Sequence, residues 1–223
     1  MAVHFGIEDI APITVPSEAT ESLDGFRQWA SSEEWDKAKL CFLHGEVWVE
    51  MGKEQIFTHS HIKSEFSIVI GGYVRSSKLG YSFVNGILLV NIIADLSCNP
   101  DYTFVSHNSF ASGRVTLFDG SREGFTEMHG SPDMVLEVVS DSSEKKDWFR
   151  LREGYFDAGI KEYWIVDARG DLTEFQILKR SAKGFVETKR TASWLKSAVF
   201  GKSFKLTRGK SPQGLPAFTL DVK

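Results

Sequence analysis

The chain has 223 residues, of which 42% are hydrophobic and 25% are charged, with a formal net charge of −4. This composition is that of an ordinary globular protein and gives no sign of disorder or of a membrane protein. The longest apolar run, residues 87–94, is too short to cross a bilayer and contains Asn91.

The cysteines and the first residues favour a cytoplasmic protein. Cys41 and Cys98 are the only two cysteines and lack metal-ligand spacing, so no disulfide framework is expected. The first six residues have neither a basic start nor a hydrophobic block, which argues against a secretory signal. We therefore expect a reducing, cytoplasmic setting and no membrane partner.

The first half of the chain predicts two helices and a hairpin. A short helix is expected over residues 23–30, and a hairpin over residues 40–51. The clearest helix begins at Ile62, where apolar residues recur on one face with a period of 3.6. Thr58 or Ser60 is placed to cap its start.

The second half predicts strands interrupted by a helix. Strands are expected over residues 87–94, 102–105, 114–118, 133–140, 161–167 and 172–178, and a helix over residues 144–158. This order indicates an α/β (α+β) fold, a mixed sheet flanked by helices with added hairpins.

Glu137 lies inside one of the most apolar stretches, residues 133–140. This stretch predicts a strand that is buried on both faces. Burying an isolated ionised carboxylate there would cost several kcal/mol of folding free energy. A metal ion would give Glu137 a function. A salt bridge to a nearby Arg or Lys, or a solvated strand end, is the equally open alternative.

Asp101 is the second candidate carboxylate, because it starts another apolar strand directly after Pro100. Carboxylates on neighbouring strands can converge on Mg²⁺, which accepts one or two of them and keeps several waters. Taken alone, Asp101 is typical of a turn-capping residue. Asp133, which also follows a proline, keeps that structural interpretation.

Several segments resemble one known family in the same order along the chain. They are residues 44–51, 59–62, 100–105, 132–140, 155–160 and 162–167. Together they resemble the Uma type of restriction-endonuclease-like proteins, which belong to the PD-(D/E)XK nuclease superfamily. The resemblance covers residues 22–178, with a weaker echo around residues 215–222.

The resemblance implies a restriction-endonuclease-like sheet core and a Mg²⁺-dependent site for phosphodiester cleavage, where Mn²⁺ could substitute. The metal-binding acids of the family fall on Asp101 and Glu137. A lysine two residues after the second acid would fall on Val139, and the family's more common lysine position falls on Leu151. The expected lysine is therefore absent at both positions.

Basic residues on the same predicted helix could replace this lysine. The candidates are Lys145, Lys146, Arg150 and Arg152, and none matches the α-helical face of Leu151 well. Lys146 is the residue that we predict to be catalytic. The alternative for all four residues is a solvated helical face.

Weaker candidates lie upstream. Glu50 could point into the same cleft, or it could be an exposed strand residue. His59 and His61 could cap the first long helix or contact phosphate, and a structural role is favoured for both.

Three parts of the chain are expected: a flexible lead-in over residues 1–17, a PD-(D/E)XK nuclease-like domain over residues 18–178, and a basic extension over residues 179–223 packed on or beside it. From Lys179 onward, 11 Lys or Arg face two acidic residues, which gives +9 and leaves −13 on the first 178 residues. Such an extension suits a phosphate-facing surface, and a solvated tail is the alternative.

The leading hypothesis is a metal-dependent endonuclease that cleaves double-stranded DNA. Asp101, Glu137 and the carbonyl of Val138 would bind Mg²⁺, and the basic extension would contact backbone phosphates. One alternative is a DNA-binding protein that has weakened or lost catalysis, which Leu151 favours. Another is a structural interaction protein. A homodimer is expected by analogy with nucleases that cut both strands.

Overall fold

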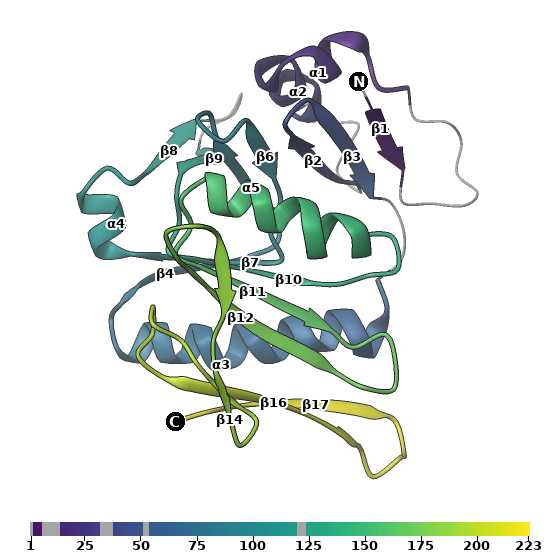
Figure 1. Cartoon of the computed structure of the whole chain (residues 1–223), viewed down its shortest axis with the longest axis vertical. Helices are drawn as coiled ribbons and strands as arrows, with labels where there is room; N and C mark the ends of the chain where they lie inside the picture. Colours follow the sequence, from purple (N-terminus) through teal and green to yellow (C-terminus); the bar gives the residue numbers. More distant parts are fainter. Residues whose placement is uncertain (1, 6–13, 32–37, 51–53, 120–123) are drawn as a thin grey trace.

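The computed structural model describes residues 2–5, 14–31, 38–50, 54–119 and 124–223. In this part of the chain the strands form three sheets (Figure 1). The first sheet contains, in spatial order, β1 (Ala2–Phe5), β3 (Glu46–Glu50), β2 (Lys39–Leu43), β6 (Leu96–Cys98), β5 (Leu88–Asn91), β9 (Phe125–Gly130) and β8 (Val115–Asp119).

The second sheet is central and carries the strand of Glu137. Its order is β13 (Phe185–Glu187), β12 (Glu174–Arg180), β11 (Glu162–Asp167), β10 (Met134–Val138), β7 (Tyr102–Ser106) and β4 (Gly80–Val84). Strand β10 runs parallel to β11 and antiparallel to β7. All of β10 is buried, so the prediction of a strand buried on both faces is confirmed.

Two helices cover the two faces of this sheet, α3 (Ile62–Ser76) and α5 (Leu151–Asp157) (Figure 1). Because side chains alternate along a strand, Leu136 and Val138 pack with α3, whereas Val135 and Val139 pack with α5. Glu137 therefore points to the α5 side. The predicted mixed sheet flanked by helices is confirmed.

The third sheet covers the outer side of α3 (Figure 1). It consists of β14 (Arg190–Thr191), β15 (Trp194–Lys196), β16 (Ser203–Lys210) and β17 (Pro216–Val222). Phe204 and Leu220 join the apolar cluster of α3 and Trp164. The buried Glu162 accepts hydrogen bonds from Ser197 Oγ at 2.6 Å and from the backbone that follows. Residues 179–223 thus begin in the central sheet and then cover α3.

Of the expected lead-in over residues 1–17, the structure describes residues 2–5 and 14–17, and the rest lies outside the described residues. Ala2–Phe5 form β1, which pairs in parallel with β3, and α1 (Ser17–Glu21) starts at the end of the predicted segment. Parallel pairing uses backbone groups, which leave no side-chain pattern in the sequence. Helix α2 (Leu23–Ala30) matches its predicted range. The hairpin is also confirmed as β2 and β3, although its predicted end, Met51, lies outside the described residues.

The remaining helical segments include two π-helical stretches, η2 (Ile56–His61) before α3 and η3 (Lys146–Arg150) before α5. A short helix, α4 (His107–Ala111), follows β7. The predicted capping of α3 by Thr58 or Ser60 is wrong: the helix continues from η2, and Ser60 Oγ donates to Glu54 instead. No helix within the described ranges is long and apolar enough to span a membrane.

Candidate active site

The two predicted metal ligands, Asp101 and Glu137, lie side by side. Asp101 directly precedes β7, and the pairing of Leu136 with Tyr102 brings it next to Glu137. The Asp101 amide faces Glu137 Oε2 at 3.4 Å, and the Val138 amide donates to Asp101 Oδ2 at 2.8 Å. Both carboxylates are buried, with exposed fractions of 1% and 3%. The strand pairing thus places the three residues in one buried cluster.

The pKa values of the two carboxyl groups shift in opposite directions. Burial and the negative charge of Asp101 raise the pKa of Glu137 well above its ordinary value. Burial also disfavours the charge on Asp101, but Lys39, Lys63 and His59 outweigh it and lower the Asp101 pKa. A bound cation would relieve the repulsion that raises the pKa of Glu137.

Three cationic or titratable side chains surround Asp101. Lys39 forms an ion pair with Asp101 Oδ1, and Lys63 Nζ lies 3.6 Å from the same oxygen. His59 Nε2 lies 3.8 Å from Asp101 Oδ2, which places this weaker candidate beside the carboxylate. Although burial lowers the pKa of Lys39, Asp101 and Glu137 raise it more, so Lys39 keeps its charge.

Lys39 is a site residue that the sequence reasoning missed. It opens β2, and Cys41 and Leu43, on the same side of that strand, belong to the α5-side core cluster. The available signal in the sequence was that Lys39 shares one side of its strand with two core residues. Its partner Asp101 is 62 positions away in the sequence, so only the fold reveals the contact.

Lys146 is buried on the α5 side of the sheet. It forms an ion pair with Glu50, and its Nζ lies 3.3 Å from Asp147 Oδ1. Burial alone would lower the pKa of Lys146, but Asp147, Glu50 and Glu137 together raise it. Lys146 and Glu50 therefore belong to the same charge cluster as Glu137.

The π-helical stretch η3 places Lys146 on the same side of the helix as Leu151, the position where a lysine is expected. The Leu151 amide donates to the Lys146 carbonyl five residues earlier, which stacks the two residues on one side of the helix. With α-helical geometry, Lys146 would not share that face. Such π-bulges occur frequently at functional sites.

The other residues of this helix point elsewhere. Leu151 is fully buried in the core. Arg150 forms an ion pair with Glu46, Arg152 donates to the Phe185 carbonyl at 3.0 Å, and Lys145 is exposed. Of the four predicted substitutes, Lys146 is the one whose charge interacts with Glu137, while its ion pairs are with Glu50 and Asp147.

Tyr155 fixes the orientation of Glu137. The Tyr155 hydroxyl donates to Glu137 Oε1 at 2.5 Å and lies 3.3 Å from Cys98 Sγ. Cys98 and Cys41 are both free and buried. Burial raises the pKa of the Tyr155 hydroxyl, so the phenol stays a hydrogen-bond donor.

Asp133 has the surroundings of a structural residue. Its Oδ2 accepts from the Ser106 amide at 2.7 Å and from Ser109 Oγ at 2.8 Å, and Lys161 forms an ion pair with Oδ1. Although burial opposes the charge, these contacts lower the pKa of Asp133.

The donor set of the site fits a hard divalent cation. Asp101 and Glu137 supply carboxylate oxygens, and the Val138 carbonyl stays a predicted further ligand. Within the described ranges, no group of three or more His, Cys, Asp or Glu could hold a metal ion. Mg²⁺ suits such a small set, because it keeps several waters and binds substrate phosphate.

The protein thus has a mixed sheet flanked by helices that carries a buried acidic pair, Asp101 and Glu137, with Lys39 paired to Asp101. The model of the Uma2 family, described as "Putative restriction endonuclease", matches residues 23–208. The chain therefore belongs to this family.

A crystal structure of "a putative nuclease" from Anabaena variabilis is similar, with 17% sequence identity and a TM-score of 0.59. The match covers 81% of this chain and 90% of that chain. At this identity the likeness supports the fold alone. No curated protein matches the sequence.

Proposed function

We propose that this protein is a metal-dependent endonuclease of the PD-(D/E)XK type that hydrolyses phosphodiester bonds in double-stranded DNA. The observation that carries the proposal is the buried pair of Asp101 and Glu137, in which Lys39 forms an ion pair with Asp101 and the charge of Lys146 acts on Glu137. Family membership supports the reaction class.

The proposed cation is Mg²⁺, with Mn²⁺ as a substitute. Asp101, Glu137 and the Val138 carbonyl would hold it. When bound, such an ion polarises the phosphate and lowers the pKa of an attacking water. Tyr155 keeps Glu137 in place through its hydrogen bond to Oε1.

The two lysines have different surroundings, which suggests different roles. The Lys39 side chain is 29% exposed and can turn from Asp101 toward a phosphate oxygen. The Lys146 side chain is only 7% exposed and stays in its ion pairs. We therefore assign the contact with the developing negative charge to Lys39, and to Lys146 a fixed positive charge near Glu137.

The basic extension is proposed to contact DNA phosphates away from the scissile bond. Its sheet covers α3, on the opposite side of the central sheet from Glu137 (Figure 1). Strand β17 reaches η2, where the His61 and Phe218 rings are 6.3 Å apart. A homodimer and a cytoplasmic location stay predictions.

Incubation of the purified chain with supercoiled plasmid and linear duplex DNA tests the proposal. We expect nicking or cutting with Mg²⁺ or Mn²⁺ and none in EDTA. The Glu137→Gln variant should leave both substrates intact. DNA that remains intact with both ions and wild-type protein would overturn the proposal.

A DNA-binding protein that does not cleave is the second candidate, and Leu151 at the family's lysine position favours it. Salt-sensitive binding of duplex DNA without cleavage would support this candidate. Restoring the lysine by Leu151→Lys does not separate the two candidates. In the structure this change would place a charge in the core, where Leu151 is 0% exposed, so loss of stability would obscure any gain.

A further inference from the structure

The two cysteines of the chain lie on neighbouring strands of the first sheet. Strands β2 and β6 pair in antiparallel fashion, with Phe42 opposite Ser97. Cys41 precedes Phe42 and Cys98 follows Ser97, so the same register places the two cysteines directly opposite each other. Both side chains belong to the α5-side core cluster and therefore lie on the same face of the sheet. The two free thiols are close enough to share a hydrogen bond.

This arrangement suits a disulfide. Residues directly opposite each other on antiparallel strands have Cα atoms about 4.5–5.5 Å apart. A disulfide requires Cα atoms roughly 4.4–6.8 Å apart and side chains that approach each other. A bond between Cys41 and Cys98 therefore needs rotation of the two side chains and no change in the pairing of β2 with β6.

A chain of hydrogen bonds joins Cys98 to Glu137 in the candidate active site. The Tyr155 hydroxyl lies 3.3 Å from Cys98 Sγ and donates its hydrogen to Glu137 Oε1 at 2.5 Å. Because a hydroxyl has a single hydrogen, the Cys98 thiol is the donor toward the Tyr155 oxygen. Hydrogen bonds in such a chain strengthen one another. The Cys98 thiol thus supports the group that holds Glu137 in place.

The two thiols differ in reactivity. Although burial opposes a negative charge on Cys98, the hydrogen bond from Cys41 and the charge of Lys146 help to lower the pKa of Cys98. Burial and the interaction with Cys98 raise the pKa of Cys41. The thiolate is the nucleophilic form of cysteine, so Cys98 is the sulfur that reacts first with an oxidant.

We propose that a hydroperoxide joins Cys41 and Cys98 in a reversible disulfide that weakens the hold of Tyr155 on Glu137. The Cys98 sulfur attacks hydrogen peroxide, the O–O bond breaks, and a sulfenic acid forms with release of one water. The Cys41 sulfur then attacks the sulfenic sulfur. The S–S bond forms, and the hydroxyl group leaves as a second water with the Cys41 proton. The two thiols are oxidised, and the peroxide is reduced to two waters.

The disulfide acts on the candidate active site through Tyr155. It removes the Cys98 hydrogen that the Tyr155 oxygen accepts, so the hydrogen bond from Tyr155 to Glu137 loses cooperative support. The effect on a bound cation rests on the proposed function, because it requires Glu137 to be a ligand, whereas formation of the disulfide does not. Transient disulfides of this kind serve redox sensing in reducing compartments.

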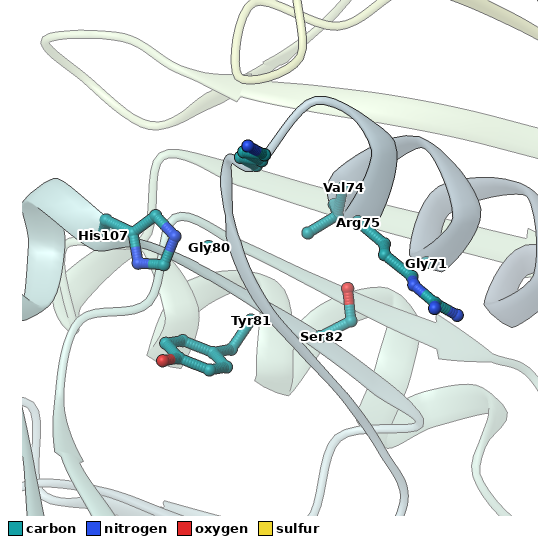
Figure 2. Close-up of a pocket in the computed structure, with 8 residues that line it drawn as sticks. Gly71, Val74, Arg75, Gly80, Tyr81, Ser82 and His107 are labelled. Atoms are coloured by element: carbon teal, nitrogen blue, oxygen red, sulfur yellow. The ribbon is translucent and has the colours of Figure 1, made fainter.

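The oxidant must be small, because Cys41 and Cys98 are only 3% and 2% exposed. A hollow of about 440 Å³ beside the edge strand β4 is lined by Val74, Tyr81 and Ser82 among others, and by neither cysteine (Figure 2). This hollow therefore gives no direct route to the thiols. Hydrogen peroxide is nearly as small as water and reaches buried groups through local opening of the fold.

Mass spectrometry of the full chain tests the disulfide. After treatment with hydrogen peroxide, we expect the intact chain to lose two hydrogen atoms and the peptides of Cys41 and Cys98 to be linked. Dithiothreitol should reverse both changes. The variants Cys41→Ser and Cys98→Ser should form no such link. The disulfide is overturned if the wild-type chain keeps both thiols, gains only oxygen atoms, or forms links only between two chains.

Calorimetric titration with Mn²⁺ tests the coupling to Glu137, with reduced and oxidised protein compared after removal of the peroxide. We expect oxidised wild type to bind Mn²⁺ about fivefold more weakly, the effect of one weakened hydrogen bond. In Tyr155→Phe the two forms should bind equally.

Tyr163→Phe is the matched control, because the Tyr163 hydroxyl donates to the Asp147 carbonyl instead, and it should keep the difference. Equal binding by reduced and oxidised wild type would overturn the coupling. No binding by reduced wild type would overturn the proposed metal site and the coupling together, whereas the linked peptides decide the disulfide separately.

Discussion

Asp133 directly precedes strand β10, and Glu137 lies four residues later within that strand. Both carboxylates are buried, yet their surroundings differ. Asp133 has an ion pair with Lys161 and two hydrogen bonds at Oδ2, and its pKa is lowered. Glu137 has a hydroxyl donor and a neighbouring carboxylate, and its pKa is raised. Burial is similar, at 2% and 3% exposure.

The difference shows that burial alone does not identify a functional carboxylate. The partners of Asp133 compensate its charge, so the folded state favours the ionised form and gains stability from it. Glu137 is held beside a like charge, an arrangement that costs stability and that a cation would relieve. The two carboxylates should therefore respond oppositely to loss of charge.

The largest expected effect is that of Glu137→Gln on cleavage. Loss of a metal ligand should reduce the rate on the order of 10²–10³-fold or more, because the cation loses a charged oxygen. The unfolding free energy should stay unchanged or rise, since the amide does not repel Asp101. Plasmid cleavage and urea denaturation check the two halves of this prediction, and full activity in the variant would contradict it.

Loss of either site lysine comes next. Lys39→Met and Lys146→Met should each reduce cleavage on the order of 10²-fold, because each removes a positive charge from the site while keeping its bulk. Single-turnover rates on a duplex substrate measure this effect. Lys161→Met is the matched control, since Lys161 pairs with Asp133. A control as slow as the site variants would show that the loss is not specific.

Asp133→Asn should act on stability. The amide cannot pair with Lys161 and brings a donor toward the Ser106 amide, so we expect a loss of about 2–3 kcal/mol in unfolding free energy. Urea denaturation measures it. Asp141→Asn, at a side chain that is 86% exposed, should change stability by less than about 0.5 kcal/mol. Equal effects of the two substitutions would contradict the structural role of Asp133.

The smallest expected effect is the pH dependence of the stability difference between wild type and Asp133→Asn. Since the Asp133 pKa is lowered in the folded state, its contribution is present above its unfolded pKa of about 3.9 and is lost as the pH falls through the lower folded value. The stability gap between wild type and Asp133→Asn should therefore narrow in acid. Urea denaturation at a series of pH values measures the gap, and a gap that widens in acid would be the opposite result.

Sequence patterns predicted much of the structure around Asp133 and Glu137. The apolar run around Glu137 indicated a buried strand, and the apolar period from Ile62 indicated α3, because burial leaves a periodic side-chain pattern. The proline before Asp133 supported a structural residue. Asp101 was matched to Glu137 because both begin or lie in strands of one sheet.

Other features left no such pattern. The contact between Lys39 and Asp101 joins two sheets and depends on how they pack. The π-helical stretch η3 places Lys146 on the same side of the helix as Leu151. A 3.6-residue period cannot predict this placement. Strand β1 pairs through its backbone. The sequence therefore predicted the carboxylates better than the cations around them.

The binding of Mn²⁺ tests the proposed metal site most directly. Calorimetric titration of wild type, Glu137→Gln and Asp133→Asn should show one ion bound by wild type and by Asp133→Asn with similar Kd. In Glu137→Gln the affinity should fall by about tenfold or more, because one of the two charged ligands is gone. No Mn²⁺ binding by wild type, or equal binding by Glu137→Gln, would contradict the assignment of Glu137 as a metal ligand.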